Sequence, residues 1–159
     1  MGDLPTNLKA SVVSGHTFTV HHRYEPRKLL GRGSFGVVCT AYDSINKKVI
    51  AIKRIRPYAN DEWDARHTLR EVRLMRLLGD HPNVISLLDL AVYDNKSELY
   101  MMMELMDCDL HRIIQSKQAL SDQHFKCFAK QMLEGLKAMH SLGVFHRDLK
   151  PGNILVSVM

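Results

Sequence analysis

The 159-residue sequence predicts an α+β protein in which a β-rich segment with one helix precedes a helical segment. Before residue 106, β-branched and alternating stretches recur, such as VIAIKRI at residues 49–55. After residue 107, apolar residues recur at helical spacing. Because 45% of the residues are hydrophobic and 25% are charged, we expect a packed core. The expected segments are an N-terminal extension (1–22), the β-rich part (23–106) and the helical part (107–159).

The β-rich part is expected to contain several strands and one helix. Phe18 and Val20 would add a strand within the extension. Gly79 would end the helix, and residues 93–97 would form a turn between two strands. In chain order, the expected elements lie at residues 29–38 (a hairpin around the glycines), 49–55, 61–78 (the helix), 84–90 and 98–105.

The helical part is expected to begin with a short helix at residues 109–115 and to continue with a long one at 121–141. Ser121 is a suitable N-cap and Gly143 a suitable C-terminal stop. One face of the long helix is predicted to be apolar, with Phe125, Phe128, Ala129, Met132, Leu133, Leu136 and Met139.

Composition excludes several classes of protein. Cys39, Cys108 and Cys127 are odd in number and widely spaced, which favours reduced thiols in the cytoplasm or nucleus over disulfides or a zinc site. No apolar run approaches the roughly 20 residues that cross a bilayer, so no membrane partner is expected. The net charge of +5 is spread along the chain without interleaved aromatic residues, so we expect no nucleic-acid partner.

A glycine motif, GRGSFG at residues 31–36, precedes a β-branched stretch. A dinucleotide-binding fold requires a helix after the third glycine and an acidic residue about 20 positions later. Residues 37–42 instead read VVCTAY and position 56 is Arg. The glycines therefore fit a hairpin that folds over phosphates, or, taken alone, a plain glycine-rich turn.

A lysine and a glutamate are predicted to pair. Strand alternation places Lys53 on the same face as the apolar residues Val49, Ala51 and Ile55. Because an unpaired buried ammonium is costly, Lys53 needs an anion, and Glu71 on the following helix can supply one. The alternative is a snorkelling lysine on an edge strand with a solvent-facing glutamate.

The octapeptide HRDLKPGN at residues 146–153 is the most specific pattern in the chain. A loop aspartate, Asp148, can orient a hydroxyl and accept its proton, and Lys150 can offset phosphoryl charge. Asn153 offers a neutral oxygen to Mg²⁺, which prefers hard oxygen ligands. A polar turn punctuated by Pro151 and Gly152 is the alternative for any one of these residues.

From about Tyr24 onward the chain resembles the amino-terminal part of a mitogen-activated protein kinase (MAP kinase). Beyond the general kinase motifs, the resemblance rests on residues 64–71 (DARHTLRE), 104–110 (ELMDCDL) and 135–141 (GLKAMHS). It implies a protein-kinase-like bilobal fold. Residues 23–106 would form a complete N-lobe with a five-stranded sheet and helix C, and 107–159 the first helices and catalytic loop of the C-lobe.

The resemblance also implies roles for individual residues. Lys53 would bind the α- and β-phosphates and pair with Glu71, and Asn153 would be a magnesium ligand. Asp148 would be the catalytic base and Lys150 the phosphate contact. The other expected ATP contacts are Leu30, Gly31, Arg32, Gly33, Ser34, Phe35, Gly36, Val37 and Val38 over the nucleotide, Val38, Ala51 and Leu155 around adenine, Met103 as gatekeeper, and Glu104 and Met106 through their backbone.

As a member of that family, the protein would transfer phosphate from Mg-ATP to protein Ser or Thr, at Ser/Thr-Pro sites, in signalling in the cytoplasm and nucleus. Its partners would be protein substrates, an upstream MAP kinase kinase and docking-motif peptides. Leu120 and His124 match the docking groove, or pack as ordinary helix residues. Arg70 and Arg147 match residues that grip a phosphothreonine, or are ordinary surface charges.

After Val156 the chain has no Asp-Phe-Gly metal ligand, Thr-x-Tyr activation lip or Ala-Pro-Glu segment. We therefore expect a C-terminally truncated kinase that does not transfer phosphate by itself. Two alternatives are a catalytically inactive module that binds ATP or a partner, and a fragment without function.

Overall fold

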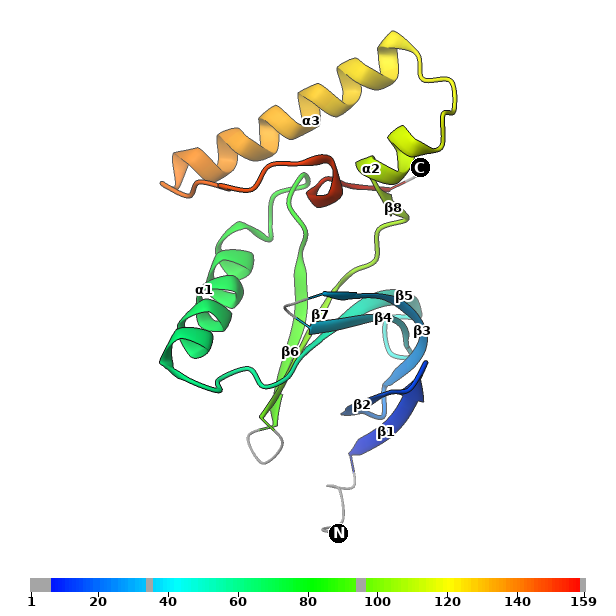
Figure 1. Cartoon of the computed structure of the whole chain (residues 1–159), viewed down its shortest axis with the longest axis vertical. Coiled ribbons are helices and arrows are strands. Elements are labelled where there is room, and N and C mark those ends of the chain that lie inside the picture. The colour runs from blue at the N-terminus through cyan, green and yellow to red at the C-terminus, as the bar shows by residue number, and fades with distance from the viewer. Residues whose placement is uncertain (1–6, 34–35, 94–96, 158–159) are drawn as a thin grey trace. The chain divides into compact units, whose positions relative to one another are not determined.

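The computed structural model describes residues 7–33, 36–93 and 97–157 (Figure 1). The chain divides into two compact units. The first comprises Met1–Arg76 with Leu87–Leu105, and the second Leu77–Ser86 with Met106–Met159. Each unit is described by itself below.

The first unit is built on a five-stranded antiparallel sheet in the order β3-β4-β5-β7-β6. A separate two-stranded hairpin and one helix accompany it. These elements confirm the α+β class and the five-stranded N-lobe that the sequence predicts. Their bounds are β1 Leu8–Val13, β2 His16–His21, β3 Tyr24–Gly33, β4 Gly36–Asp43, β5 Lys48–Ile55, α1 Glu62–Leu78, β6 Leu87–Tyr93 and β7 Glu98–Glu104.

Both faces of this sheet are covered, and two apolar cores result. Figure 1 shows the β1–β2 hairpin on one side of the sheet and α1 on the other. On the hairpin side, Phe18 and Val20 are fully buried against sheet residues such as Ile52. On the helix side, Val72 of α1 packs with Ile55 of β5. A central strand covered on both faces explains why residues 49–55 are almost continuously apolar.

The second unit contains one long helix and short elements around a loop. The predicted N-cap, Ser121, forms a capping box in which its hydroxyl accepts from the His124 N–H and its own N–H donates to His124 Nδ1. Gly143, the predicted stop, has a φ of +70° just after the helix. The elements are β8 Cys108–Asp109, α2 Leu110–Gln115, α3 Asp122–Ser141, a 3-10 turn at Pro151–Asn153 and β9 Leu155–Val156.

One strand begins later than its sequence predicts. The sequence predicts that residues 84–86 open a strand, but the strand β6 begins at Leu87. The Val84 N–H donates to the His81 carbonyl, and the Ser86 hydroxyl donates to the Gly79 carbonyl. These local bonds make residues 79–86 a compact turn region. The predicted turn at 93–97 lies mostly outside the described residues.

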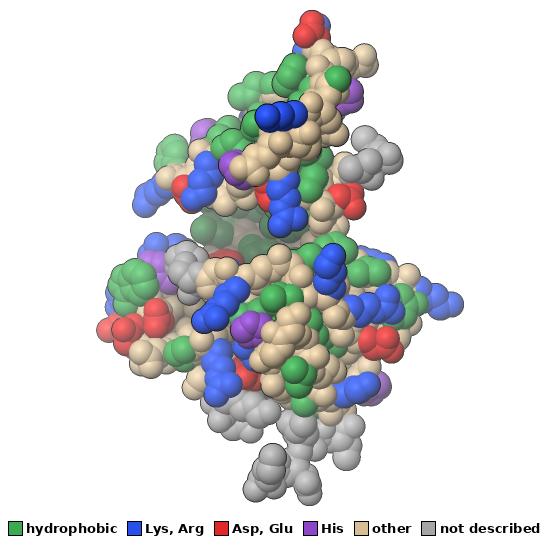
Figure 2. All heavy atoms as spheres, turned by 45° about the vertical axis from the view of Figure 1, so that its right-hand side comes forward, with side chains coloured by type: hydrophobic (Ala, Val, Ile, Leu, Met, Phe, Trp, Pro, Cys, Tyr) green, Lys and Arg blue, Asp and Glu red, His purple; other side chains and the backbone are tan. Residues whose placement is uncertain are grey.

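Charged residues of both signs lie on the face of the molecule shown in Figure 2. On the face shown in Figure 2, Lys and Arg side chains lie among acidic and hydrophobic ones rather than in one continuous patch. Among the described helices, none combines the length and the hydrophobicity needed to cross a bilayer.

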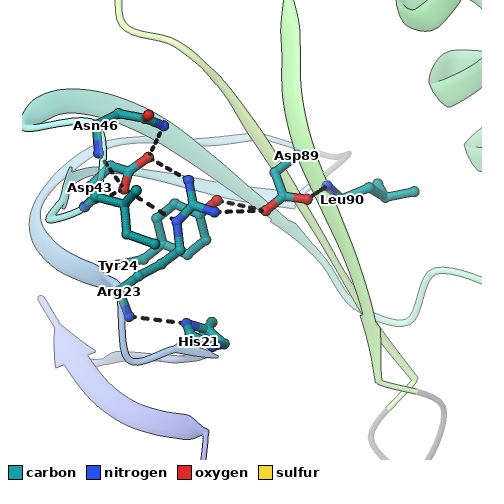
Figure 3. A network of polar contacts seen from close by, with 8 residues as sticks. His21, Arg23, Tyr24, Asp43, Asn46, Asp89 and Leu90 are labelled. Carbon is teal, nitrogen blue, oxygen red and sulfur yellow. Dashed lines mark hydrogen bonds and ion pairs between the residues drawn. The ribbon is translucent and has the colours of Figure 1, made fainter.

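A buried carboxylate at the end of β4 binds the residue that precedes β3 (Figure 3). Asp43 side-chain exposure is only 3%, and its oxygens accept from Arg23 Nε at 3.2 Å and Nη2 at 2.7 Å. The Asn46 amide also donates to it at 2.8 Å. The Arg23 guanidinium, followed by these further donors, lowers the pKa of Asp43 to about 2.

Replacing Gly36 is expected to destabilise the first unit. Gly36 has a φ of +130°, and a Cβ at this position would collide with the Arg54 carbonyl oxygen. We expect Gly36→Ala to lower the free energy of unfolding by about 2 kcal/mol or more, measured by urea denaturation. Gly33→Ala is the matched control, because a Cβ there meets no atom of the described residues within 4 Å, and it should change stability by less than about 1 kcal/mol. Equal losses in the two variants would contradict this account.

The Arg23–Asp43 pair predicts a defined pH dependence. A carboxyl whose pKa falls on folding stabilises the folded state above its unfolded pKa, and this contribution is lost as pH falls through the folded pKa. For Asp43 the loss runs from about pH 4 to about pH 2, and amounts to about 2 kcal/mol. The difference in unfolding free energy between wild type and Asp43→Asn should therefore be largest above pH 5 and shrink below pH 4. A pH-independent difference would show that ionisation of Asp43 is not the cause.

Candidate active site

Four of the predicted site residues share one face of the central sheet. Directly opposed residues of antiparallel strands point to the same side. Lys53 of β5 lies opposite Val38 of β4, and Ala51 lies opposite Met103 of β7. Two positions apart on β5, Ala51 and Lys53 face the same way. The predicted phosphate, adenine and gatekeeper positions of these three strands therefore meet on the face covered by α1.

The predicted lysine–glutamate pair is present. Lys53 Nζ donates to Glu71 Oε1 at 2.5 Å, with side-chain exposures of 16% and 36%. β5 is flanked by β4 and β7, so the alternative of a snorkelling lysine on an edge strand is wrong. Because Glu71 lies on α1, the ion pair fixes the helix against the strand. The lysine remains partly accessible, which allows a second anion to reach it.

A cavity of about 560 Å³ adjoins this pair within the first unit. Besides Lys53 and Glu71, its walls include Gly36, Ile55, Arg56 and Trp63. The third glycine of the motif and the ion pair therefore border one hollow, which is lined by cationic side chains and also by the carboxylates of Asp64 and Glu71.

The glycines lie in a hairpin, as predicted, and are followed by a strand. β3 and β4 are paired up to Gly33 opposite Gly36, and β4 continues directly from the third glycine. A strand at this place excludes the dinucleotide-binding interpretation. Gly31 and Arg32 are exposed on β3, and so is Leu30 at 42%. The predicted contacts Ser34 and Phe35 lie outside the described residues.

The side chain of Val37 faces away from the lysine. It is 7% exposed and belongs to the core on the hairpin side of the sheet. Val38, the next residue, lies opposite Lys53 on the other face. Any contact of Val37 with a nucleotide would therefore involve its backbone.

In the second unit, the predicted catalytic residues form one polar cluster. Asp148 Oδ2 accepts from Lys150 Nζ at 2.9 Å and from Asn153 Nδ2 at 3.0 Å. Asn153 Nδ2 also donates to the Asp148 carbonyl at 2.9 Å. Lys150, followed by Asn153, lowers the pKa of Asp148, so the group is an ionised acceptor at neutral pH.

The same cluster fits a magnesium ion bound mainly by phosphate. Asn153 uses its amide nitrogen toward Asp148, which leaves the amide oxygen as the atom able to ligate a cation. Mg²⁺ is commonly held by one or two protein oxygens together with phosphates and water. Within the part of the chain that the structure describes, no three His, Cys, Asp or Glu side chains form a metal site.

Backbone pairing fixes the loop that bears these residues. The segment after the loop, β9, pairs with β8, and the Leu110 N–H donates to the Ile154 carbonyl at 2.8 Å. Arg147 has a φ of +64°, and the Asp148 N–H donates to His146 Nδ1 at 3.2 Å. The sequence interpretation assigned His146 no separate role, and the structure shows that its ring helps to shape the turn before Asp148.

The remaining predicted residues are divided between the units. Glu104 is exposed at the end of β7, whereas Met106 and Leu155 belong to the second unit. Arg70 and Arg147 likewise lie in different units. His124 caps α3, a role that its assignment to a docking groove did not include.

Comparisons with known proteins identify the family. The family model for the protein kinase domain matches residues 24–159. The chain is 43% identical over 150 residues to mitogen-activated protein kinase 4a of Physcomitrium patens, covering 92% of the chain and 40% of that protein. It is 46% identical over 143 residues to mitogen-activated protein kinase 7 of Arabidopsis thaliana, covering 88% and 39%.

Extracellular signal-regulated kinase 1 of Dictyostelium discoideum is 45% identical over 148 residues, covering 91% of the chain and 28% of that protein. The chain thus spans about two fifths or less of the length of these relatives. The matched region includes the glycine hairpin, the lysine–glutamate pair and the loop around Asp148. The chain belongs to the protein kinase domain family and, within it, to the mitogen-activated protein kinases.

Proposed function

We propose that the protein is a serine/threonine kinase that transfers phosphate from Mg-ATP to protein Ser or Thr, with a preference for Ser/Thr-Pro sites. The observation that supports it most is the ion pair between Lys53 and Glu71, 2.5 Å long, on a sheet face beside the glycine hairpin. In phosphoryl transfer the protein contributes mainly positioning and electrostatic stabilisation. A lysine held in place by a carboxylate suits both tasks.

The residues have separate roles in this proposal. Lys53 binds phosphate oxygens, and Glu71 holds its ammonium in place. Asp148 accepts the proton of the substrate hydroxyl, and Lys150 offsets charge on the transferred phosphoryl group. Magnesium, bound through Asn153 and the phosphates, would offset further charge.

The proposed setting follows from the family. The relatives named above are mitogen-activated or extracellular signal-regulated kinases. We extend to this protein a role in signalling in the cytoplasm and nucleus, with protein substrates, an upstream MAP kinase kinase and docking-motif peptides as partners. Loss of any of these contacts would be visible as weaker retention of this protein in pull-down experiments with the full-length partner.

Lys53→Met is expected to weaken nucleotide binding at least ten-fold, because it removes the cation that meets the phosphates. The measurement is titration of the 159-residue chain with a fluorescent ATP analogue in the presence of Mg²⁺. Lys48→Met is the matched control, since Lys48 is an exposed lysine on the same strand. Equal affinities of wild type and Lys53→Met would contradict the proposed phosphate contact.

In the full-length protein, Asp148→Asn should lower phosphate transfer to a Ser-Pro peptide by on the order of 10² to 10⁴, because the amide cannot accept the hydroxyl proton. The 159-residue chain by itself is expected to transfer no phosphate. Nucleotide affinity should change by less than about three-fold, since Asp148 is proposed to act on the acceptor. Asp122→Asn, an exposed carboxylate on α3, is the control, and a Ser-Ala peptide tests the proline preference. Transfer that persists in Asp148→Asn would refute the assigned base. Nucleotide binding without transfer to either peptide would instead support the nucleotide-binding module.

A further inference from the structure

The residue after Lys53 belongs to a row of directly opposed side chains on the other face of the sheet. Arg54 of β5 is opposite Val37 of β4 and Tyr100 of β7. This row faces the β1–β2 hairpin, because Val37 and Tyr100 belong to the core that contains Phe18. Arg54 therefore extends a guanidinium into an apolar interface, where its side chain is only 12% exposed. A cation there requires specific partners.

The hairpin supplies several of those partners. Arg54 Nη1 donates to the Thr17 carbonyl, and its Cζ lies 5.4 Å from the centroid of the Phe18 ring. The nearest anion is Glu98 on β7, with Nη1 to Oε1 at 4.0 Å. Arg54 Nε is buried and has no hydrogen-bond partner among the described residues. The guanidinium is thus held as much by β2 as by its carboxylate.

Tyr100 makes the second contact with the same strand. Its hydroxyl accepts from the Thr19 N–H at 2.9 Å and donates to Glu98 Oε2 at 2.9 Å. Thr17 and Thr19 are two positions apart, so they present backbone groups on the same side of β2. Arg54 and Tyr100 therefore bind backbone groups of β2. The Glu98 carboxylate links the two side chains, because it accepts from the Tyr100 hydroxyl and lies near the Arg54 guanidinium.

Arg54 also contacts the nucleotide-facing side through its backbone. It follows Lys53 directly, and a Cβ on Gly36 would collide with its carbonyl oxygen. A displacement of Arg54 therefore shifts both the lysine and the third glycine of the motif.

We propose that Arg54 is a positioning residue, through which the β1–β2 hairpin fixes Lys53 and Gly36 in the nucleotide site. The nucleotide part of this proposal rests on the proposed function. The hairpin contacts at Thr17, Phe18 and Thr19 lie outside the region matched by the protein kinase domain, residues 24–159. Nucleotide affinity would then depend on residues that precede the kinase domain.

The test compares Arg54→Met with Arg23→Met in the 159-residue chain. Methionine keeps an unbranched stem similar to the aliphatic part of arginine and removes the charge and the donors. Arg23 is the matched control, because it also pairs with a buried carboxylate, Asp43, but does so at the end of β4 far from Gly36. Native-state hydrogen exchange at residues 36–38 and 53–55, and titration with a fluorescent ATP analogue and Mg²⁺, are measured for each variant.

Arg54→Met should accelerate exchange at those residues at least ten-fold relative to Arg23→Met, and weaken nucleotide binding at least ten-fold. Arg23→Met should change affinity less than three-fold, and Arg54→Lys should recover part of the loss. Unchanged exchange in Arg54→Met, or equal effects of both methionine variants on exchange, would overturn the proposal. If the wild type binds no nucleotide, the proposed function fails, and the exchange data still decide whether Arg54 positions this region.

A milder variant covers the case in which Arg54→Met does not fold. Tyr100→Phe removes only the hydroxyl that joins Thr19 to Glu98. It should accelerate exchange at residues 36–38 and 53–55 in the same direction by at least three-fold. No acceleration in Tyr100→Phe, with the first variant unfolded, would also refute the proposal.

Discussion

The central position of β5 is the constraint on which the first unit depends. Both faces of this strand are covered, and neighbouring residues on it, Lys53 and Arg54, extend cations to opposite faces. Each buried or half-buried cation needs a carboxylate, and each carboxylate comes from a different element. Glu71 from α1 meets the first and Glu98 from β7 approaches the second. These carboxylates therefore couple β5 electrostatically to α1 and to the neighbouring strand β7, in addition to apolar packing.

The cations on the two faces of β5 are paired with carboxylates in different ways. Lys53 has one short contact, at 2.5 Å, and remains accessible to a further anion. Glu98 is shared, because it accepts from Tyr100, lies 3.3 Å from Arg56 and is 4.0 Å from Arg54. Removal of the Glu98 carboxylate would take the anion away from Arg54, whose side chain is only 12% exposed, and this costs more than the loss of a single surface pair. The helix side is thus suited to bind a ligand and the hairpin side to hold a fixed geometry.

The parts of the structure that were predictable are those with a local signature. The helix at α1, the glycine hairpin and the Lys53–Glu71 pair follow from periodicity, turn residues and the cost of burying an ammonium. Val84 was misassigned because an apolar run resembles a strand, whereas its N–H is used in a turn. Arg54 was missed because one arginine in a strand forms no motif. Its role appears only when register places it opposite Tyr100.

The glycine motif shows how one pattern can combine two requirements. Gly36 is required by packing, since its positive φ and its approach to the Arg54 carbonyl exclude a side chain without any ligand. Gly31 and Gly33 have no neighbour within 4 Å of a Cβ among the described atoms. The internal contacts of the described chain therefore do not explain why glycine occurs at those two positions. A phosphate group that approaches the backbone closely is the chemistry proposed for this hairpin, and it would account for them.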